Sequence, residues 1–147
     1  MREIESFFCD HHLTQAGLDQ LDYIVENRPV ELTPDEASRL PSIILAFTAE
    51  EFGIFEKDIL GKRRSDEEMA ARRAACEVFR TLTTLDTDQM SLLVGGSAEA
   101  YLSDSRRLLT ENKYYLACVL HISNKTLIEL GYSNRSDATG SWFVEAV

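Results

Sequence analysis

The segment 65–82 constrains the fold more than any other part of this chain. It begins with Ser65-Asp-Glu-Glu68, the pattern of a capping box, in which the first and last side chains each accept a backbone N–H at a helix start. Apolar residues then recur at helical spacing in one continuous stripe: Ala71, Ala74, Ala75, Val78, Phe79 and Leu82. The segment therefore predicts a helix over about 66–82 that buries this stripe and exposes Arg73 and Arg80.

Further helix signals surround this segment. Capping patterns at Thr33–Glu36 and Asp86–Gln89 predict two more helix starts, and Pro41 is expected to interrupt the first helix or to begin a new one. Gly95-Gly96 predicts a tight turn before the next helix. No segment alternates convincingly as a strand, and the polar stretch 133–140 predicts a loop. The expected fold class is all-α, a helical bundle.

Length and composition fit a globular protein. With 147 residues, the chain allows one domain or one domain with a small appendage. No apolar run approaches the roughly 18 residues that indicate a membrane span, and the acidic start Met1-Arg-Glu-Ile-Glu5 is unlike a signal peptide. Three widely spaced cysteines do not form a disulfide framework and suit a reducing compartment. A cytoplasmic protein without a membrane partner is expected.

Charge is distributed unevenly along the chain. Residues 1–56 hold three basic and twelve acidic side chains, whereas residues 57–147 hold twelve basic and thirteen acidic ones. Proteins that bind double-stranded DNA usually neutralise several phosphates with Lys and Arg. Any DNA binding by this chain therefore depends on a local basic patch, for which the segment 60–64 is the candidate.

One family shares this layout of basic segment, long helix and two helices joined by a glycine pair. The features that match it are Leu60-Gly-Lys-Arg-Arg64, Arg72-Arg73, Leu82-Thr83, Gly95-Gly96, Leu102 and Arg107. Over about 44–109 the chain resembles the C-terminal DNA-binding domain of the bacterial replication initiator DnaA, which has a Trp-repressor-like helix-turn-helix. The resemblance implies DNA contacts from eight residues: Lys62, Arg63, Arg64, Arg72, Arg73, Ser97, Ser103 and Arg107.

The chain departs from that family just after the glycine pair. There the family carries Arg, Asp, His and Thr, which contact bases, and this chain carries Ser97-Ala-Glu-Ala100. No Arg, Asn or Gln remains at these positions for a bidentate contact with guanine or adenine. Glu99 and Asp104 would also face phosphates. The sequence predicts weak, mostly nonspecific binding to double-stranded DNA.

Other chemistries find little support in the sequence. Cys9-Asp10-His11-His12 contains metal-ligand types, but no second cluster follows at ligand spacing and His121 stands alone. No phosphate-binding glycine loop and no cysteine–histidine pairing is evident. We therefore expect no metal, no cofactor and no enzymatic activity.

Three regions are expected: an acidic helical extension at 1–42, a helix-turn-helix domain at 43–112, and a C-terminal helical addition and tail at 113–147. The leading hypothesis is a small cytoplasmic DNA-associated regulator. The alternative is a protein-interaction module in which the helix-turn-helix is only a scaffold. In that alternative the acidic N-terminal third binds a basic partner or covers the basic segment, so that its deletion would strengthen DNA binding.

Overall fold

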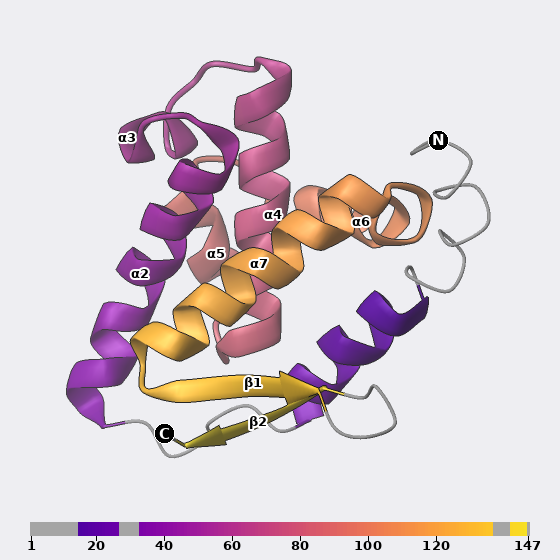
Figure 1. The fold of residues 1–147 in the computed structure, drawn as a ribbon. Helices are drawn as coiled ribbons and strands as arrows, with labels where there is room; N and C mark the ends of the chain where they lie inside the picture. Colours follow the sequence, from indigo (N-terminus) through magenta and orange to yellow (C-terminus); the bar gives the residue numbers. More distant parts are fainter. Residues whose placement is uncertain (1–14, 27–32, 137–141, 147) are drawn as a thin grey trace.

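The computed structural model describes residues 15–26, 33–136 and 142–146. Residues 15–26 are helical and form the unlabelled indigo helix of Figure 1. The elements that follow are α2 (Pro34–Phe52), α3 (Glu56–Ile59), α4 (Asp66–Leu82), α5 (Thr87–Val94), α6 (Ala98–Glu111), α7 (Lys113–Glu129), β1 (Tyr132–Ser136) and β2 (Trp142–Ala146). The fold class is a helical bundle, as predicted, with a two-stranded hairpin at its C-terminal end.

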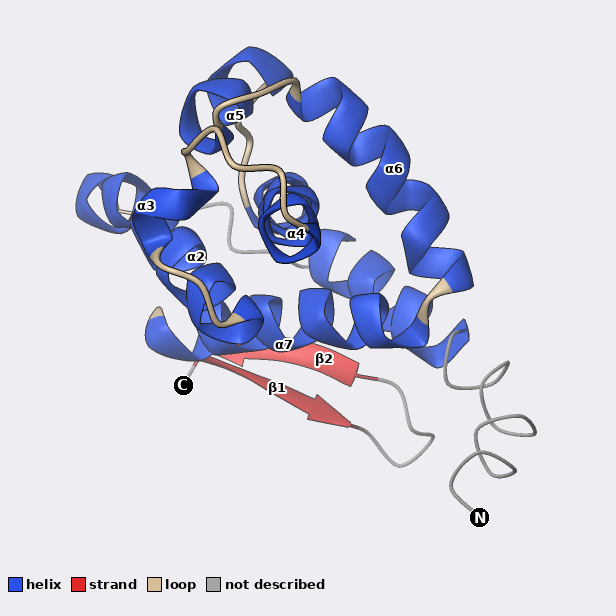
Figure 2. Cartoon of the chain, turned by 90° about the horizontal axis from the view of Figure 1, so that it is seen from above, coloured by secondary structure: helices blue, strands red, loops and turns tan. Residues whose placement is uncertain are grey.

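Helix α4 is the centre of the bundle. It packs against α2, α6 and α7, and it is seen end-on between them in Figure 2. The predicted apolar stripe is confirmed, since every one of its residues is buried. Its alanines let the neighbouring helices approach α4 closely. Arg73 and Arg80 are half-buried rather than exposed, because each pairs with a carboxylate, Asp104 and Glu77 respectively.

Local signals position the helix ends as the sequence predicts. Each of the three predicted capping boxes forms, with reciprocal side-chain and backbone bonds: Thr33 with Glu36, Ser65 with Glu68, and Asp86 with Gln89. Helix α5 ends at Gly95, which has a left-handed backbone with φ +69°. Glycine adopts this conformation without steric cost.

The N-terminal third is more closely integrated than an appended extension. Helix α2 runs unbroken through Pro41, so the expected interruption is wrong and the boundary after residue 42 falls inside a helix. Leu21, Ile24 and Leu40 belong to the hydrophobic core. Gly17 lies so close to α7 that a Cβ there would sit 2.7 Å from the Leu116 side chain. These contacts join the described residues 15–26 and 33–42 to the rest of the bundle.

The C-terminal region differs from the prediction. Residues 133–136 of the segment expected to be a loop belong to β1, and residues 137–140 lie outside the described residues. Helix α7 before it is one continuous helix over Lys113–Glu129. Strand β1 pairs antiparallel with β2, from Tyr132 opposite Ala146 to Ser136 opposite Trp142. A polar strand such as β1 carries no alternating apolar pattern, so only its pairing partner reveals it. In the described part of the chain, no helix combines the length and apolarity needed to cross a bilayer.

The two ends of the molecule are distinct. Helix α3 and the loop that follows it lie at one end, and the β-hairpin lies at the other (Figure 1). Helix α2 connects the two ends, with its N-terminus near the hairpin and its C-terminus near α3 (Figure 1).

Candidate functional site

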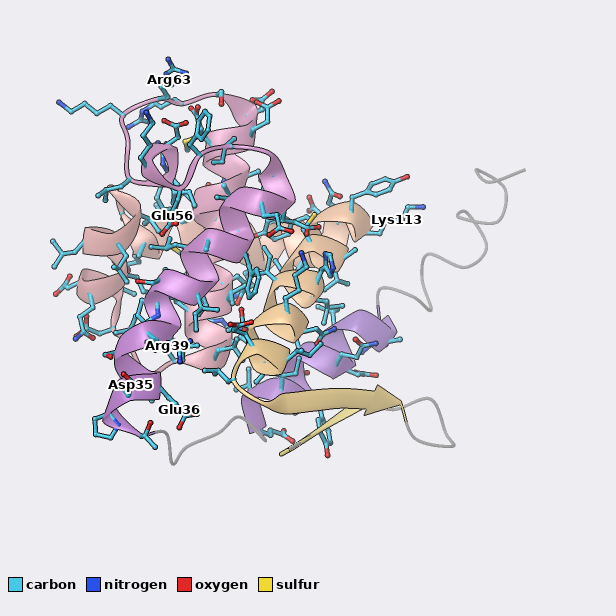
Figure 3. All side chains as sticks on the ribbon, turned by 60° about the vertical axis from the view of Figure 1, so that its left-hand side comes forward. Asp35, Glu36, Arg39, Glu56, Arg63 and Lys113 are labelled. Atoms are coloured by element: carbon cyan, nitrogen blue, oxygen red, sulfur yellow. The ribbon has the colours of Figure 1, made fainter. Side chains whose placement is uncertain are left out.

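Three exposed cations form the candidate site. Lys62, Arg63 and Arg64 lie in the short segment between α3 and α4, here called the basic loop (Gly61–Arg64). Among the described residues, none of the three side chains makes an ion pair or hydrogen bond. Figure 3 shows Arg63 projecting from the end of the molecule. The predicted basic patch is therefore exposed and its charges are available to a partner.

Arg72 has a different role from the one the resemblance implied. Its side chain is only 2% exposed. Its Nε donates to the carbonyl of Ile59 at 2.7 Å, and its second guanidinium nitrogen donates to the carbonyls of Asp58 and Gly61 at 3.1 and 2.6 Å. These carbonyls end α3 and begin the basic loop. Arg72 therefore cannot contact phosphate in this conformation, and instead holds the loop from beneath.

Two other predicted cations are paired within the chain. Arg73 donates from Nε to the Asp104 carboxylate at 3.2 Å and so links α4 to α6. Arg107 is exposed but pairs with Glu111 one helical turn later, at 3.1 Å. An exposed pair of this kind contributes only about 0.3–0.5 kcal/mol, so a phosphate could displace Glu111. The half-buried pair of Arg73 is less available.

Leu60, the residue just before the basic loop, lies in direct contact with Gly95 in the turn between α5 and α6. A Cβ added to Gly95 would sit 2.6 Å from the carbonyl oxygen of Leu60, the residue just before the basic loop. Real Cβ atoms do not approach a backbone oxygen so closely, so only glycine fits here. The contact places the turn between α5 and α6 next to the residue that precedes the basic loop.

The outer face of α6 carries Arg106, a cation that the sequence analysis did not select. Glu99, Ser103 and Arg106 follow one another at spacings of four and three, and all three are exposed. Together with Thr87 and Leu102 they line a surface hollow of about 360 Å³. Ser97, by contrast, uses its hydroxyl to cap α6 by accepting the Ala100 N–H. The helical spacing from Glu99 and Ser103 could have indicated that Arg106, and not Arg107, shares their face of α6.

Acidic residues flank the basic loop on both sides. Glu56 and Asp58 lie in α3, and Asp66 and Glu67 lie in the first turn of α4. The positive charge of the loop is therefore local and does not extend over a broad surface. Salt would screen such a small patch beyond the Debye length of about 8 Å.

Asp35 and Glu36, two acidic residues of the region 1–42, do not cover the basic loop. Figure 3 shows Asp35 and Glu36 at the end of the molecule opposite Arg63. The 19-residue α2 helix separates the two ends, a length of about 28 Å. This separation is several Debye lengths at physiological salt. Residues 1–14, which hold further acids, lie outside the described residues.

The two described thiols, Cys76 and Cys118, are poor nucleophiles. Burial, and secondarily the neighbouring Glu77, raises the pKa of Cys76 to about 12. Burial, and then the charge and hydrogen bond of Glu51, raises the pKa of Cys118 to about 11. Both thiols are therefore almost fully protonated at neutral pH, whereas a catalytic cysteine needs the thiolate.

A buried polar cluster joins α4, α6 and α7. Ser105 donates to the Glu77 carboxylate at 2.9 Å, and the hydroxyls of Ser105 and Tyr115 lie 2.5 Å apart. Burial is the largest cause that raises the pKa of Tyr115 above its usual value. All three side chains are buried, so this cluster stabilises the helix packing and has no access to substrate.

No metal centre is found in the part of the chain that the structure describes, where no three His, Cys, Asp or Glu side chains are grouped to hold an ion. The Cys9–His12 segment lies outside the described residues. Comparison of the chain with protein-family models, with curated proteins and with solved structures gave no match.

Proposed function

We propose that this chain is a small regulator that associates with double-stranded DNA, mainly through phosphate contacts from Lys62, Arg63 and Arg64. The observation that carries the proposal is the basic loop itself, which is exposed and held by the buried Arg72. Leu60, the residue just before it, contacts the α5–α6 turn. In this proposal α5 and α6 act as a helix-turn-helix of the type found in the DnaA DNA-binding domain. The role is binding rather than catalysis.

The chemistry of α6 limits the expected specificity. When a helix-turn-helix binds DNA, its second helix enters the major groove and its N-terminal residues contact base edges. In this chain that position carries Glu99 and Ala100, which offer no bidentate contact with a purine. Contacts to phosphate carry no sequence information. Binding is therefore weak, in the nonspecific range of roughly 10⁻⁴–10⁻⁶ M at physiological salt.

A salt titration of DNA binding tests this proposal. The intact chain is titrated with a labelled duplex at several salt concentrations, and the slope of log affinity against log salt is measured. The Arg63→Ala/Arg64→Ala double variant should lose most of the binding and flatten the slope by about two units, because each phosphate contact contributes about one. Arg39→Ala is the matched control, since Arg39 is exposed at the opposite end of the molecule (Figure 3).

Two results would contradict the proposal. The first is the absence of DNA binding even at low salt. The second is equal loss of binding in the double variant and in Arg39→Ala, which would indicate a general charge effect and no site at the basic loop. Glu99→Ala should strengthen binding slightly or leave it unchanged, because it removes a negative charge that faces the phosphates.

A second candidate function is a protein-interaction module in which the helix-turn-helix is a scaffold. One observation favours it, namely that large apolar side chains are exposed beside the basic loop. Phe55 and Leu60 flank α3, and Leu92 lies on α5. DNA phosphates do not require such side chains.

A further inference from the structure

Three exposed apolar side chains lie around the point where Leu60, after α3, meets Gly95, after α5. Phe55, Leu60 and Leu92 are 71%, 55% and 79% exposed. The other large apolar residues with comparable exposure among the described residues, Tyr114 and Ile128, both lie on α7. Single exposed apolar residues are ordinary on protein surfaces, whereas a group of them commonly marks an interaction site.

The backbone geometry brings these three residues together. Phe55 and Leu60 cap the two ends of α3, which is only four residues long. The carbonyl of Leu60 lies directly against Gly95 at the end of α5, and Leu92 precedes Gly95 by less than one helical turn. The three side chains therefore start from the two ends of α3 and from the last turn of α5, which meet at the contact between Leu60 and Gly95.

The fold does not need Leu92 to be apolar. Helix α5 already contributes Met90 and Val94 to the core, and Leu93 packs partly against it. Leu92 points away from this face, so a polar residue at the same position would leave the core complete. The apolar side chain at Leu92 therefore has no role in the folded chain alone.

Cations border this apolar group. Lys57 places its Nζ 5.7 Å from the centre of the Phe55 ring. Lys62 and Arg63 follow Leu60 directly in the basic loop and are exposed. Apolar centres with a charged rim are typical of protein interfaces. Glu56 and Asp58 lie along α3 between Phe55 and Leu60, so the cations without a described partner, Lys62 and Arg63, gather at the Leu60 edge of the group. A partner with carboxylates at that edge would complement them.

We propose that this apolar–basic surface (Phe55, Leu60 and Leu92, with Lys57, Lys62 and Arg63) binds an acidic amphipathic helix of a partner protein. Such a helix places apolar residues on one face at spacings of three and four and acidic residues beside them. The apolar face covers the three exposed side chains, and the carboxylates approach the cations. The inference is independent of DNA binding, although the two partners would compete for Lys62 and Arg63.

A synthetic peptide provides a direct test. The probe is a fluorescein-labelled peptide of about 15 residues, the length at which isolated helices become marginally stable, with leucines on one face and glutamates elsewhere. Its fluorescence anisotropy is measured against the intact chain. Leu92→Ser should weaken binding about tenfold, which corresponds to about 1.4 kcal/mol. The matched control is Ile128→Ser, an exposed apolar residue 62% accessible on α7, near the hairpin end of the molecule.

The control peptides separate the two parts of the interaction. Replacing the leucines with alanine should remove most of the binding, and replacing the glutamates with glutamine should remove its salt dependence. Both protein variants keep their buried cores, so circular dichroism and thermal unfolding should match the unsubstituted chain. Phe55→Ser offers a second variant of the same surface, with the same expected weakening.

Three results would overturn the inference. One is the absence of saturable binding of the acidic peptide. Another is equal weakening by Leu92→Ser and Ile128→Ser. The third is binding to vesicles of anionic lipid that Leu92→Ser abolishes while peptide binding is unchanged, because the surface would then face a membrane. Absence of DNA binding by the intact chain would contradict the DNA proposal and would not affect this conclusion, so the two proposals fail separately.

Discussion

The substitution Arg72→Met tests whether the hydrogen bonds of the Arg72 guanidinium hold the basic loop in place. The substitution keeps a long side chain but removes hydrogen bonds to three carbonyls, those of Asp58, Ile59 and Gly61. Hydrogen bonds from a charged donor contribute about 1.5–3 kcal/mol each. Asp58 and Gly61 are only half-buried, so water can replace the guanidinium there, whereas Ile59 is 1% exposed and its carbonyl loses its partner.

The expected loss follows from this difference. The Ile59 carbonyl accounts for about 2–3 kcal/mol and the two wetter carbonyls for about 0.5–1 kcal/mol each. Burying a thioether in place of a cation recovers about 1 kcal/mol, because the desolvation penalty of the guanidinium disappears. The net decrease in the free energy of unfolding is about 3 kcal/mol. Arg72→Lys should lose less, since an ammonium retains one or two of the bonds.

Urea unfolding followed by circular dichroism measures this decrease. With a slope of about 2 kcal/mol per molar urea, the midpoint of Arg72→Met should fall by about 1.5 M. Arg64→Met is the matched control, because its exposed side chain has no described partner and its loss should stay within about 0.5 kcal/mol. A decrease of less than about 1 kcal/mol in the free energy of unfolding of Arg72→Met would refute the idea that Arg72 holds the basic loop. So would unchanged stability with a DNA salt slope flattened by about one unit, because Arg72 would then be a phosphate contact.

Further predictions concern the turn, the polar cluster and the thiols. Gly95→Ala should lose more stability than Gly53→Ala in thermal unfolding, because both positions have a left-handed backbone but only Gly95 also meets a carbonyl oxygen. Left-handed strain alone costs about 1–2 kcal/mol, and equal losses would contradict the close contact. Tyr115→Phe should cost about 1–2 kcal/mol by chemical denaturation, because it breaks the bond to a buried serine; an unchanged midpoint would exclude that bond. Cys118 should react with a disulfide reagent about tenfold faster for each pH unit up to about 11, where its thiolate forms; a plateau near pH 8 would contradict the raised pKa.

The elements fixed by local signals could be predicted from the sequence. The stripe of α4 and the three capping boxes each depend on residues within a few positions of one another, and all of them formed as predicted. The turn at Gly95 was equally predictable, because a left-handed C-cap favours glycine. The general position of the basic loop followed from these boundaries.

Features that depend on distant partners could not be predicted. Arg72 looked like a surface cation beside Arg73, because periodicity does not reveal that its acceptors lie 11 to 14 residues earlier in the chain. The partner of Arg73 is 31 residues away, on another helix. Strand β1 is polar, and its hydrogen bonds come from β2. Each of these corrections concerns a contact that forms only when the elements pack together.

The hydrogen bonds from Arg72 to the basic loop affect how fast a binding partner can associate with that loop. Since the loop backbone is ordered by the folded chain, a partner does not have to wait for a slow rearrangement before it docks. Rigid-body association of this kind has a rate that rises linearly with partner concentration, without saturating at a conformational step. Its salt dependence reflects attraction between charges as the two molecules approach. Replacing Arg72 would free the loop backbone, and association would then include a step in which the loop becomes ordered.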